Sequence, residues 1–129
     1  MPCTSSDQCP MKHSACINDR CICNPGYFYS ETNGGCITDC KKPGSDYVEY
    51  PQSKLVGHTS LTFYPLGTEP EDCFNKLLEY GSRFVSFDYR FGLKACMLQE
   101  VTALMVDPAD YEIITATNYV WSHFQRTCA

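Results

Sequence analysis

The sequence predicts a small disulfide-rich module followed by an α+β domain, in which one helix packs on an antiparallel sheet. The chain has 129 residues and ten cysteines, so five disulfides are expected to supplement a small core. Six cysteines lie in the first 36 residues among turn-forming residues. The other four are spread over a stretch with strand and helix patterns. We therefore expect one module at residues 1–38 and a second at residues 39–129.

Charge and hydropathy exclude two classes of protein. The formal net charge is -5 and only 19% of the residues are charged, whereas a nucleic-acid binder needs a clustered positive face. No apolar run approaches the roughly 20 residues that cross a bilayer, so no membrane-spanning segment is expected. A disulfide-rich chain belongs to an oxidising compartment. We expect an extracellular, secreted protein. Pro2 and Cys3 follow Met1 directly, without the basic and apolar regions of a signal peptide, so we expect that the signal peptide has been removed.

The cysteine order of the first module is C-x5-C-x6-C-x4-C-x-C-x12-C, and the fifth cysteine is followed by Asn-Pro-Gly-Tyr at residues 24–27. Six cysteines alone allow fifteen pairings. The C-x-C step and the following Gly-Tyr resemble an EGF-like module over residues 3–36. This resemblance implies three disulfides: Cys3-Cys16, Cys9-Cys21 and Cys23-Cys36.

Metal binding is not expected in this module. Cys21 and Cys23 with His13 nearby lack the paired C-x2-C spacing of structural zinc sites. Calcium-binding EGF-like modules place acidic residues and an amide before the first cysteine, where this sequence has only Met1 and Pro2. A calcium site would therefore require a native chain that extends further back, and the sequence leaves this open. The aromatic triplet at residues 27–29 is either a contact surface or a cover for the disulfides, and the second interpretation is favoured.

The second module opens with two predicted strands and a helix. Residues 47–50 and 55–64 are enriched in β-branched and aromatic side chains, which favours strands. Thr68 and Glu71 have capping-box spacing, Pro70 suits a first helical turn, and Gly81 can end the helix. Cys73, Leu77 and Tyr80 then share one face, with Phe74 and Leu78 beside it. That face is expected to be buried.

A β-hairpin and two more strands are predicted after the helix. Residues 84–89 alternate like a half-buried strand, residues 90–92 form a turn, and residues 93–99 return. Pro108 breaks the chain before two further strands at 111–116 and 119–124, which we expect to finish the sheet. The last one holds Trp121, the only tryptophan, and is predicted to be core.

A helix that opens with a cysteine, a strand that ends F-x-Y, and a hairpin that returns C-x-L together resemble a PAN or apple domain over residues 40–128. The residues that carry the resemblance are Cys73, Phe87, Tyr89, Cys96 and Leu98. The resemblance implies disulfides Cys73-Cys96 and Cys40-Cys128. A further bridge of the fuller family pattern would fall near Leu77 and Phe84, which are apolar here. We expect a hydrophobic contact to replace it.

No catalytic constellation is recognisable, so we expect no enzyme and no cofactor. His13, His58 and His123 stand in three different contexts, without a G-x-S-x-G or H-E-x-x-H motif. Every cysteine is already assigned to a disulfide. The acidic residues at 69, 71 and 72 suit a helix N-terminus, where the macrodipole favours negative charge.

The candidate ligand-binding residues lie at the end of the predicted hairpin: Tyr89, Arg90, Phe91 and Lys94. Aromatic side chains with arginine are typical of binding hot spots and of sugar-stacking platforms. The alternative interpretation is that the two aromatic rings face the core while the two cations are ordinary solvated charges. The sequence leaves both interpretations open.

The two resemblances imply an extracellular, non-enzymatic binding or adhesion protein that recognises a protein or a carbohydrate. One alternative is a secreted inhibitor of a clotting protease or of platelet adhesion. Another is an EGF-receptor-type agonist, although only residues 37–39 separate Cys36 from the next module. Sulfated glycans are disfavoured because neither module is basic. The sequence leaves the oligomeric state open.

Overall fold

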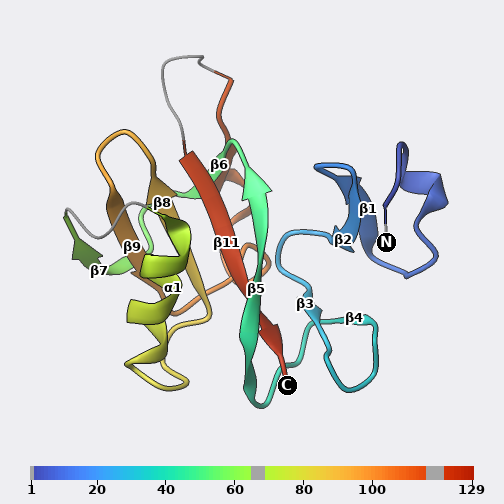
Figure 1. The fold of residues 1–129 in the computed structure, drawn as a ribbon, viewed down its shortest axis with the longest axis horizontal. Helices are drawn as coiled ribbons and strands as arrows, with labels where there is room; N and C mark the ends of the chain where they lie inside the picture. The colour runs from blue at the N-terminus through green and yellow to red at the C-terminus, as the bar shows by residue number, and fades with distance from the viewer. Residues whose placement is uncertain (1, 65–68, 116–120) are drawn as a thin grey trace.

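Figure 1 shows the computed structural model, which describes residues 2–64, 69–115 and 121–129. Residues 2–38, here called the disulfide segment, form two small antiparallel sheets, one of β1 with β2 and one of β3 with β4. Their elements are the short 3-10 helix η1 Ser6–Gln8 and the strands β1 Ser14–Ile17, β2 Arg20–Cys23, β3 Phe28–Tyr29 and β4 Cys36–Ile37. Asn18 and Asp19 join β1 to β2 with φ of 54° and 64°, the conformation of a tight type I′ hairpin turn.

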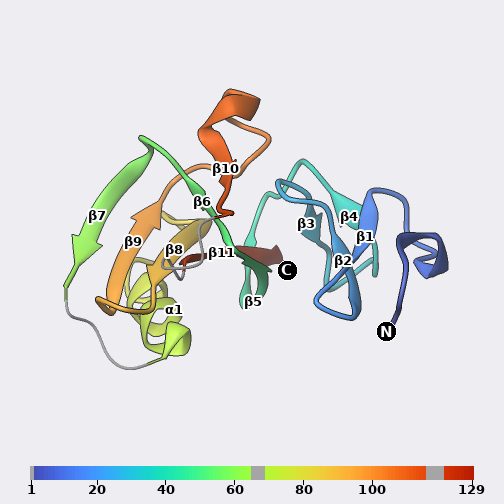
Figure 2. The same cartoon turned by 90° about the horizontal axis from the view of Figure 1, so that it is seen from above.

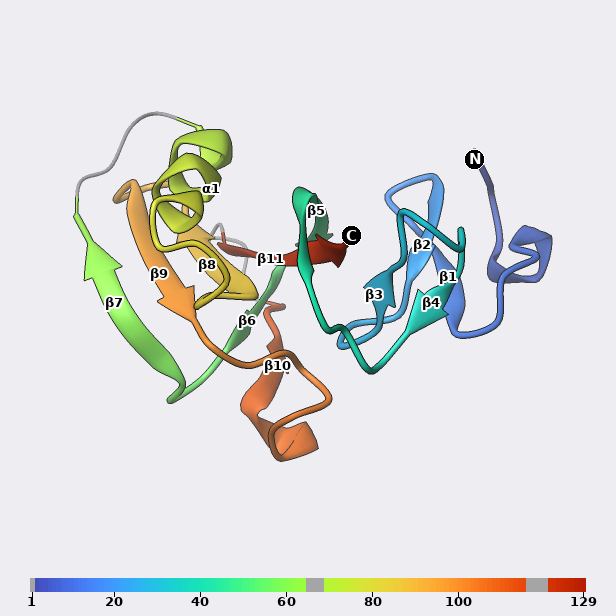
Figure 3. The same ribbon diagram turned by 90° about the horizontal axis from the view of Figure 1, so that it is seen from below.

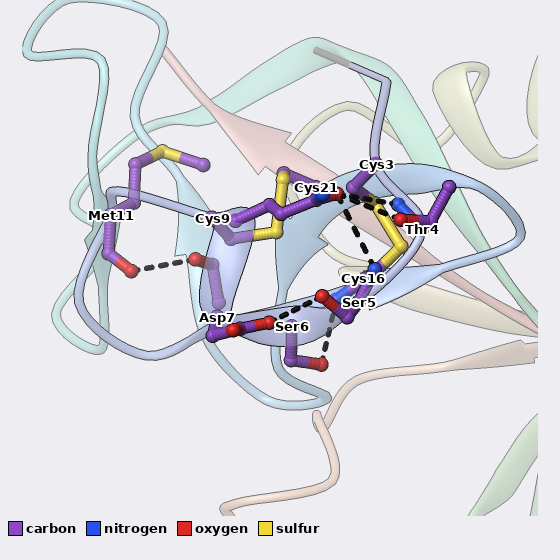
Figure 4. Close-up of a disulfide and its surroundings, with 11 residues drawn as sticks. Cys3, Thr4, Ser5, Ser6, Asp7, Cys9, Met11, Cys16 and Cys21 are labelled. Atoms are coloured by element: carbon purple, nitrogen blue, oxygen red, sulfur yellow. Dashed lines mark hydrogen bonds between the residues drawn. A yellow bond between two sulfur atoms is a disulfide. The ribbon is translucent and has the colours of Figure 1, made fainter.

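Five disulfides are present, and their pairing is the one that the two resemblances imply. They are Cys3–Cys16, Cys9–Cys21, Cys23–Cys36, Cys40–Cys128 and Cys73–Cys96. Figure 4 shows the first two side by side, where the backbone N–H of Cys16 donates to Ser6 Oγ at 3.1 Å. Cys23 and Phe28 are 1% and 2% exposed, so one disulfide and one aromatic ring of this segment are removed from solvent.

Residues 39–129, here called the sheet segment, contain an antiparallel five-stranded sheet with one helix packed on it. The strand order is β5-β11-β8-β9-β7, so the last strand of the chain lies inside the sheet (Figure 1). The elements of this sheet and its helix are β5 Pro43–Pro51, β7 Thr59–Phe63, α1 Pro70–Leu78, β8 Ser86–Arg90, β9 Ala95–Gln99 and β11 Trp121–Cys128. In the described residues, no helix is long and apolar enough to cross a membrane.

Helix α1 covers one face of the sheet and forms the main core with it. Cys73, Phe74 and Leu77 are buried on the helix, and Phe87 stacks on Phe124 beneath it at 4.7 Å between ring centroids. Phe84 joins the same buried cluster and, like Leu77, is 0% exposed. The two apolar residues at the position of the additional bridge thus lie in one core, as expected.

The ends of the helix differ from the prediction. The helix begins at Pro70, with Glu69 as N-cap, and the Asp72 carboxylate accepts the Glu69 backbone N–H at 3.1 Å. Thr68, the predicted cap, lies outside the described residues. Gly81 follows the helix at φ 66°, consistent with its expected role. Tyr80 stays 36% exposed, so the buried face ends one turn earlier than predicted.

The predicted strand at residues 55–64 is wrong, because it consists of two strands in different sheets. β6 Ser53–Leu55 pairs with β10 Tyr111–Ile113, and β7 pairs with β9. Between β6 and β7, Gly57 turns the chain at φ 83° and Val56 donates its N–H to Asp110 O at 2.8 Å. The predicted strand at residues 111–116 therefore does not finish the main sheet, and its last residue lies outside the described residues.

The other strand predictions are correct in type and differ in their ends. β5 extends four residues before the predicted segment 47–50, and β8 starts two residues later than predicted. The hairpin turn occupies residues 91–94 instead of 90–92. β11 is described from Trp121 to Cys128, well past the predicted end at residue 124, because it pairs with β5 on one side and β8 on the other. Residues 119 and 120 of that predicted strand lie outside the described residues.

The disulfide segment is joined to the sheet segment along β11. Gly26 donates its N–H to Gln125 Oε1 at 2.9 Å, and Gln125 Nε2 donates to Tyr27 O at 2.9 Å. Glu31 donates its N–H to Cys128 O at 2.8 Å. Figure 2 shows β11 ending between the five-stranded sheet and strands β1 to β4. These bonds define the junction between the two segments.

We predict that Leu77→Ala lowers the free energy of unfolding by about 2 to 5 kcal/mol, because it removes a fully buried side chain from the core. Urea denaturation of the oxidised protein measures this loss. Leu93→Ala is the control, since Leu93 is 41% exposed and should cost less than about 0.5 kcal/mol. Equal losses for the two variants would contradict the assigned core.

Candidate ligand-binding site

The hairpin-end residues chosen from the sequence do not form one accessible site. Tyr89 is 0% exposed and lies edge-on to Phe91 at 5.1 Å between ring centroids. Phe91 packs against the core. Tyr89 as a ligand contact is therefore wrong: the first four residues of β8 are all buried, because the strand lies inside the sheet beneath α1. Lys94 is exposed in the turn and Arg90 is half-buried.

Arg90 instead belongs to a cluster around Trp121. Its guanidinium carbon lies 5.7 Å from the centroid of the Trp121 ring, and Lys54 Nζ lies 4.9 Å from the same centroid. Cations over an aromatic face are attracted by its quadrupole. Both cations lie near the ring on which a sugar would stack. This cluster is therefore a poor stacking platform.

A groove of about 770 Å³ lies between the disulfide segment and strand β5. Figure 3 shows β5 at the edge of the sheet that faces strands β1 to β4. One wall is β5 and the other is the β1–β2 hairpin with the residues before it. The lining residues are Pro10, Met11, Ile17, Asn18, Arg20, Cys21, Ile22, Cys23, Tyr29, Asp46, Tyr47, Val48, Glu49 and Thr127.

The two walls of the groove differ in charge. Arg20 lies on the hairpin side, whereas Asp46 and Glu49 lie on β5. Burial raises the pKa of the Tyr47 phenol, and the carboxylates of Glu71 and Asp46 raise it further. The β5 wall is therefore negative around Tyr47, whereas Met11, Ile17 and Val48 supply apolar surface. Ligand sites commonly combine such an apolar lining with a few polar groups.

Sequence reasoning missed this groove. Its walls come from residues 10–29 and 46–49, which belong to different segments and have no common pattern in the sequence. Tyr29 is the one groove residue that the sequence offered as a contact candidate. It is 36% exposed, whereas its neighbour Phe28 is buried as the favoured interpretation expected.

The second face of the sheet carries a sealed polar network, not an open catalytic site. His123 Nδ1 lies 2.8 Å from Asp88 Oδ1, and Asp88 Oδ2 accepts Gln99 Nε2 at 2.6 Å. Asp88 Oδ2 also accepts the Leu55 backbone N–H at 3.1 Å. His123 is 0% exposed, so a substrate cannot reach its ring. The pair instead fixes β6 against the sheet.

Three cysteine sulfur atoms lie close together in the disulfide segment, but they form no metal site. The sulfur atoms of Cys3, Cys9 and Cys21 lie within 4.8 Å of one another (Figure 4). Each belongs to a disulfide, whereas zinc is held by free thiolates. His13 does not join them in this group, and its ring stacks on Tyr27 at 4.4 Å between ring centroids.

Comparisons with protein-family models, with curated proteins and with solved structures find no match for this chain.

We predict that Gln125→Ala lowers the free energy of unfolding by about 1 to 3 kcal/mol. The substitution leaves the Gly26 N–H and the Tyr27 carbonyl without their partners at a buried junction. Urea denaturation measures the loss. Gln52→Ala is the control, because the Gln52 side chain is exposed. A loss no larger than that of the control would contradict the role of Gln125.

Tyr50 gives a pH-dependent prediction. Burial raises the pKa of its phenol, and its hydroxyl donates to Cys23 O across the junction. The neutral phenol therefore contributes stability that is complete below its ordinary pKa of about 10 and is lost as pH rises above it. In an alkaline titration of the folded protein, the phenolate absorbance gained at about pH 10 should be the same for Tyr50→Phe as for the unsubstituted protein.

The same titration in urea is the control for this prediction. There, Tyr50→Phe should lower the total phenolate absorbance by the contribution of one tyrosine out of nine. An equal decrease in the folded protein near about pH 10 would show that Tyr50 is accessible and would contradict its burial.

Proposed function

We propose that the protein is an extracellular, non-enzymatic binding protein, built from an EGF-like module and a PAN/apple domain, that captures a protein ligand. The disulfide pairing within each segment supports this architecture, as does the bridge from α1 to β9, Cys73–Cys96. Five disulfides fit an oxidising compartment. The two modules act as one unit in this proposal, because the junction along β11 connects them by buried hydrogen bonds.

The groove is the observation that carries the proposal. It combines apolar side chains, an exposed tyrosine and opposed charges in about 770 Å³, a size typical of ligand sites. These are features of protein recognition, in which aromatic residues carry much of the binding energy. A carbohydrate ligand is less favoured, because Arg90 and Lys54 already lie over the Trp121 ring.

Binding is also favoured over catalysis by the burial of the Asp88–His123 pair. A general base must lie within hydrogen-bonding reach of a substrate proton, and this imidazole is 0% exposed. In the described ranges, the hydrogen bonds of histidine rings go to carboxylates, His58 to Asp110 and His123 to Asp88. An inhibitory role would use the same groove to occupy a partner's surface.

The proposal predicts that the oxidised protein binds extracellular matrix or cell-surface proteins on an array, and that Tyr29→Ala weakens those hits at least about tenfold, as for a hot-spot aromatic. Tyr80→Ala is a matched control. Both tyrosines are 36% exposed, but Tyr80 lies after α1 and does not line the groove. Arg90→Ala should also leave the protein hits unchanged.

Glycans on the same array provide the opposing outcome. Hits that free sugar abolishes, that Arg90→Ala weakens and that Tyr29→Ala leaves unchanged would place recognition at the Trp121 cluster. Such a result would make the protein a lectin and would contradict binding in the groove.

A further inference from the structure

The outer edge of β5 carries main-chain groups that point away from the sheet. Arg126 donates its N–H to Val85 O at 2.9 Å, on the β8 side of β11. Because successive main-chain groups of a strand alternate in direction, Gln125 points to the other side, where its partner is Val48. The main chain of Val48 is therefore paired with β11, and that of Tyr47 and Glu49 points outward.

These outward groups face the groove. Residues 46–49 of β5 line it along about 13 Å of extended chain. The Tyr47 N–H donates to the Asp46 side chain at 2.8 Å, which an incoming carbonyl can replace. An open strand edge is a template for another strand. The β1–β2 hairpin forms the opposite wall, so an incoming segment would lie between β5 and the hairpin, and the hairpin would obstruct the sheet of a second copy.

We propose that the groove binds an extended segment of the partner protein, which adds to β5 as an antiparallel strand. The inference rests on the proposed function and names the form of its ligand. The antiparallel direction follows the sheet, in which every pair of neighbouring strands is antiparallel. Main-chain hydrogen bonds supply affinity in this mode of recognition, and alternate side-chain pockets supply specificity.

The two faces of the added strand meet different chemistry. Residues opposite Tyr47 and Glu49 place their side chains on the α1 face, where Tyr47 packs on Phe74 at 4.6 Å between ring centroids. The carboxylates of Glu71 and Glu49 both act on Tyr47 and make that face acidic, so basic side chains are favoured. The alternate residues share the face of Val48, which pairs with Gln125. Because Val48, Met11 and Ile17 all line the groove, apolar side chains are favoured at these positions. The preferred segment therefore alternates basic and apolar residues.

The test uses an acetylated and amidated peptide of about seven residues, in which lysine and valine alternate, with binding followed by fluorescence anisotropy. In antiparallel pairing, residues opposite Tyr47 and Glu49 present both their side chains to α1 and their main chain to β5. N-methylation of the lysines should therefore weaken binding at least about tenfold, by loss of paired N–H groups. N-methylation of the valines should change binding less than about twofold.

A charge exchange in the protein provides a second test. Glu49→Lys should reverse the preference from the lysine–valine peptide to a glutamate–valine peptide by at least about tenfold. The matched control is Glu112→Lys, an equal charge change on exposed β10 outside the groove, which should keep the original preference. The N-methylated peptides leave the protein unaltered, so they remain decisive if Glu49→Lys fails to fold.

Several outcomes would overturn the inference. No saturable binding of the lysine–valine peptide up to about 1 mM would do so. Equal effects of the two N-methylated peptides would also do so, and a larger effect at the valines would contradict the antiparallel direction. If array proteins still bound in a Tyr29-dependent manner, the proposed function would stand and strand addition would be wrong. If neither the lysine–valine peptide nor the array proteins bound, both the strand addition and the proposed function would be wrong. Dimer formation, measured by light scattering, would instead indicate that a second copy of the chain occupies the edge.

Discussion

The arrangement of the two segments depends on the pair of hydrogen bonds made by the Gln125 carboxamide. Its oxygen accepts from Gly26 and its nitrogen donates to Tyr27 O, both at 2.9 Å, and the residue is 1% exposed. A Cβ on Gly26 would clash with the Leu104 side chain, so glycine is needed where these two residues approach each other. The junction holds the β1–β2 hairpin opposite β5 and apart from it, and the space between them is the groove.

The two faces of the five-stranded sheet are built on different principles. The α1 face is packed with aromatic and aliphatic side chains, where burial of apolar surface provides the stability. The other face holds Asp88, His123 and Gln99, whose burial is tolerable only when they bond one another or the backbone. Both faces of the sheet are covered, and the side chain of Tyr89 is therefore inaccessible to a ligand. In the proposed function, an edge of the sheet is therefore the surface for recognition.

The β5 edge combines protection with access. Natural sheets guard their edges with charged side chains or with covering elements, and β5 has both Asp46 and Glu49 and the facing hairpin. The features that oppose aggregation also make the edge selective for its proposed ligand. The carboxylates favour basic side chains on the α1 face, and the hairpin favours apolar side chains on the other face. In the proposed strand addition, affinity for a peptide and resistance to self-association have the same physical origin.

The sequence by itself determined the local features. Cysteine spacing, through the two resemblances, led to all five pairings, and the helical pattern identified the buried face of α1 with Leu77 on it. Tertiary structure alone decided that residues 55–64 divide between two sheets, that β11 lies inside the sheet, and that Tyr89 is buried. It also formed the groove from residues 10–29 and 46–49. Periodicity indicates which side of an element is apolar, but not which distant element covers it, because that choice depends on packing across the whole chain.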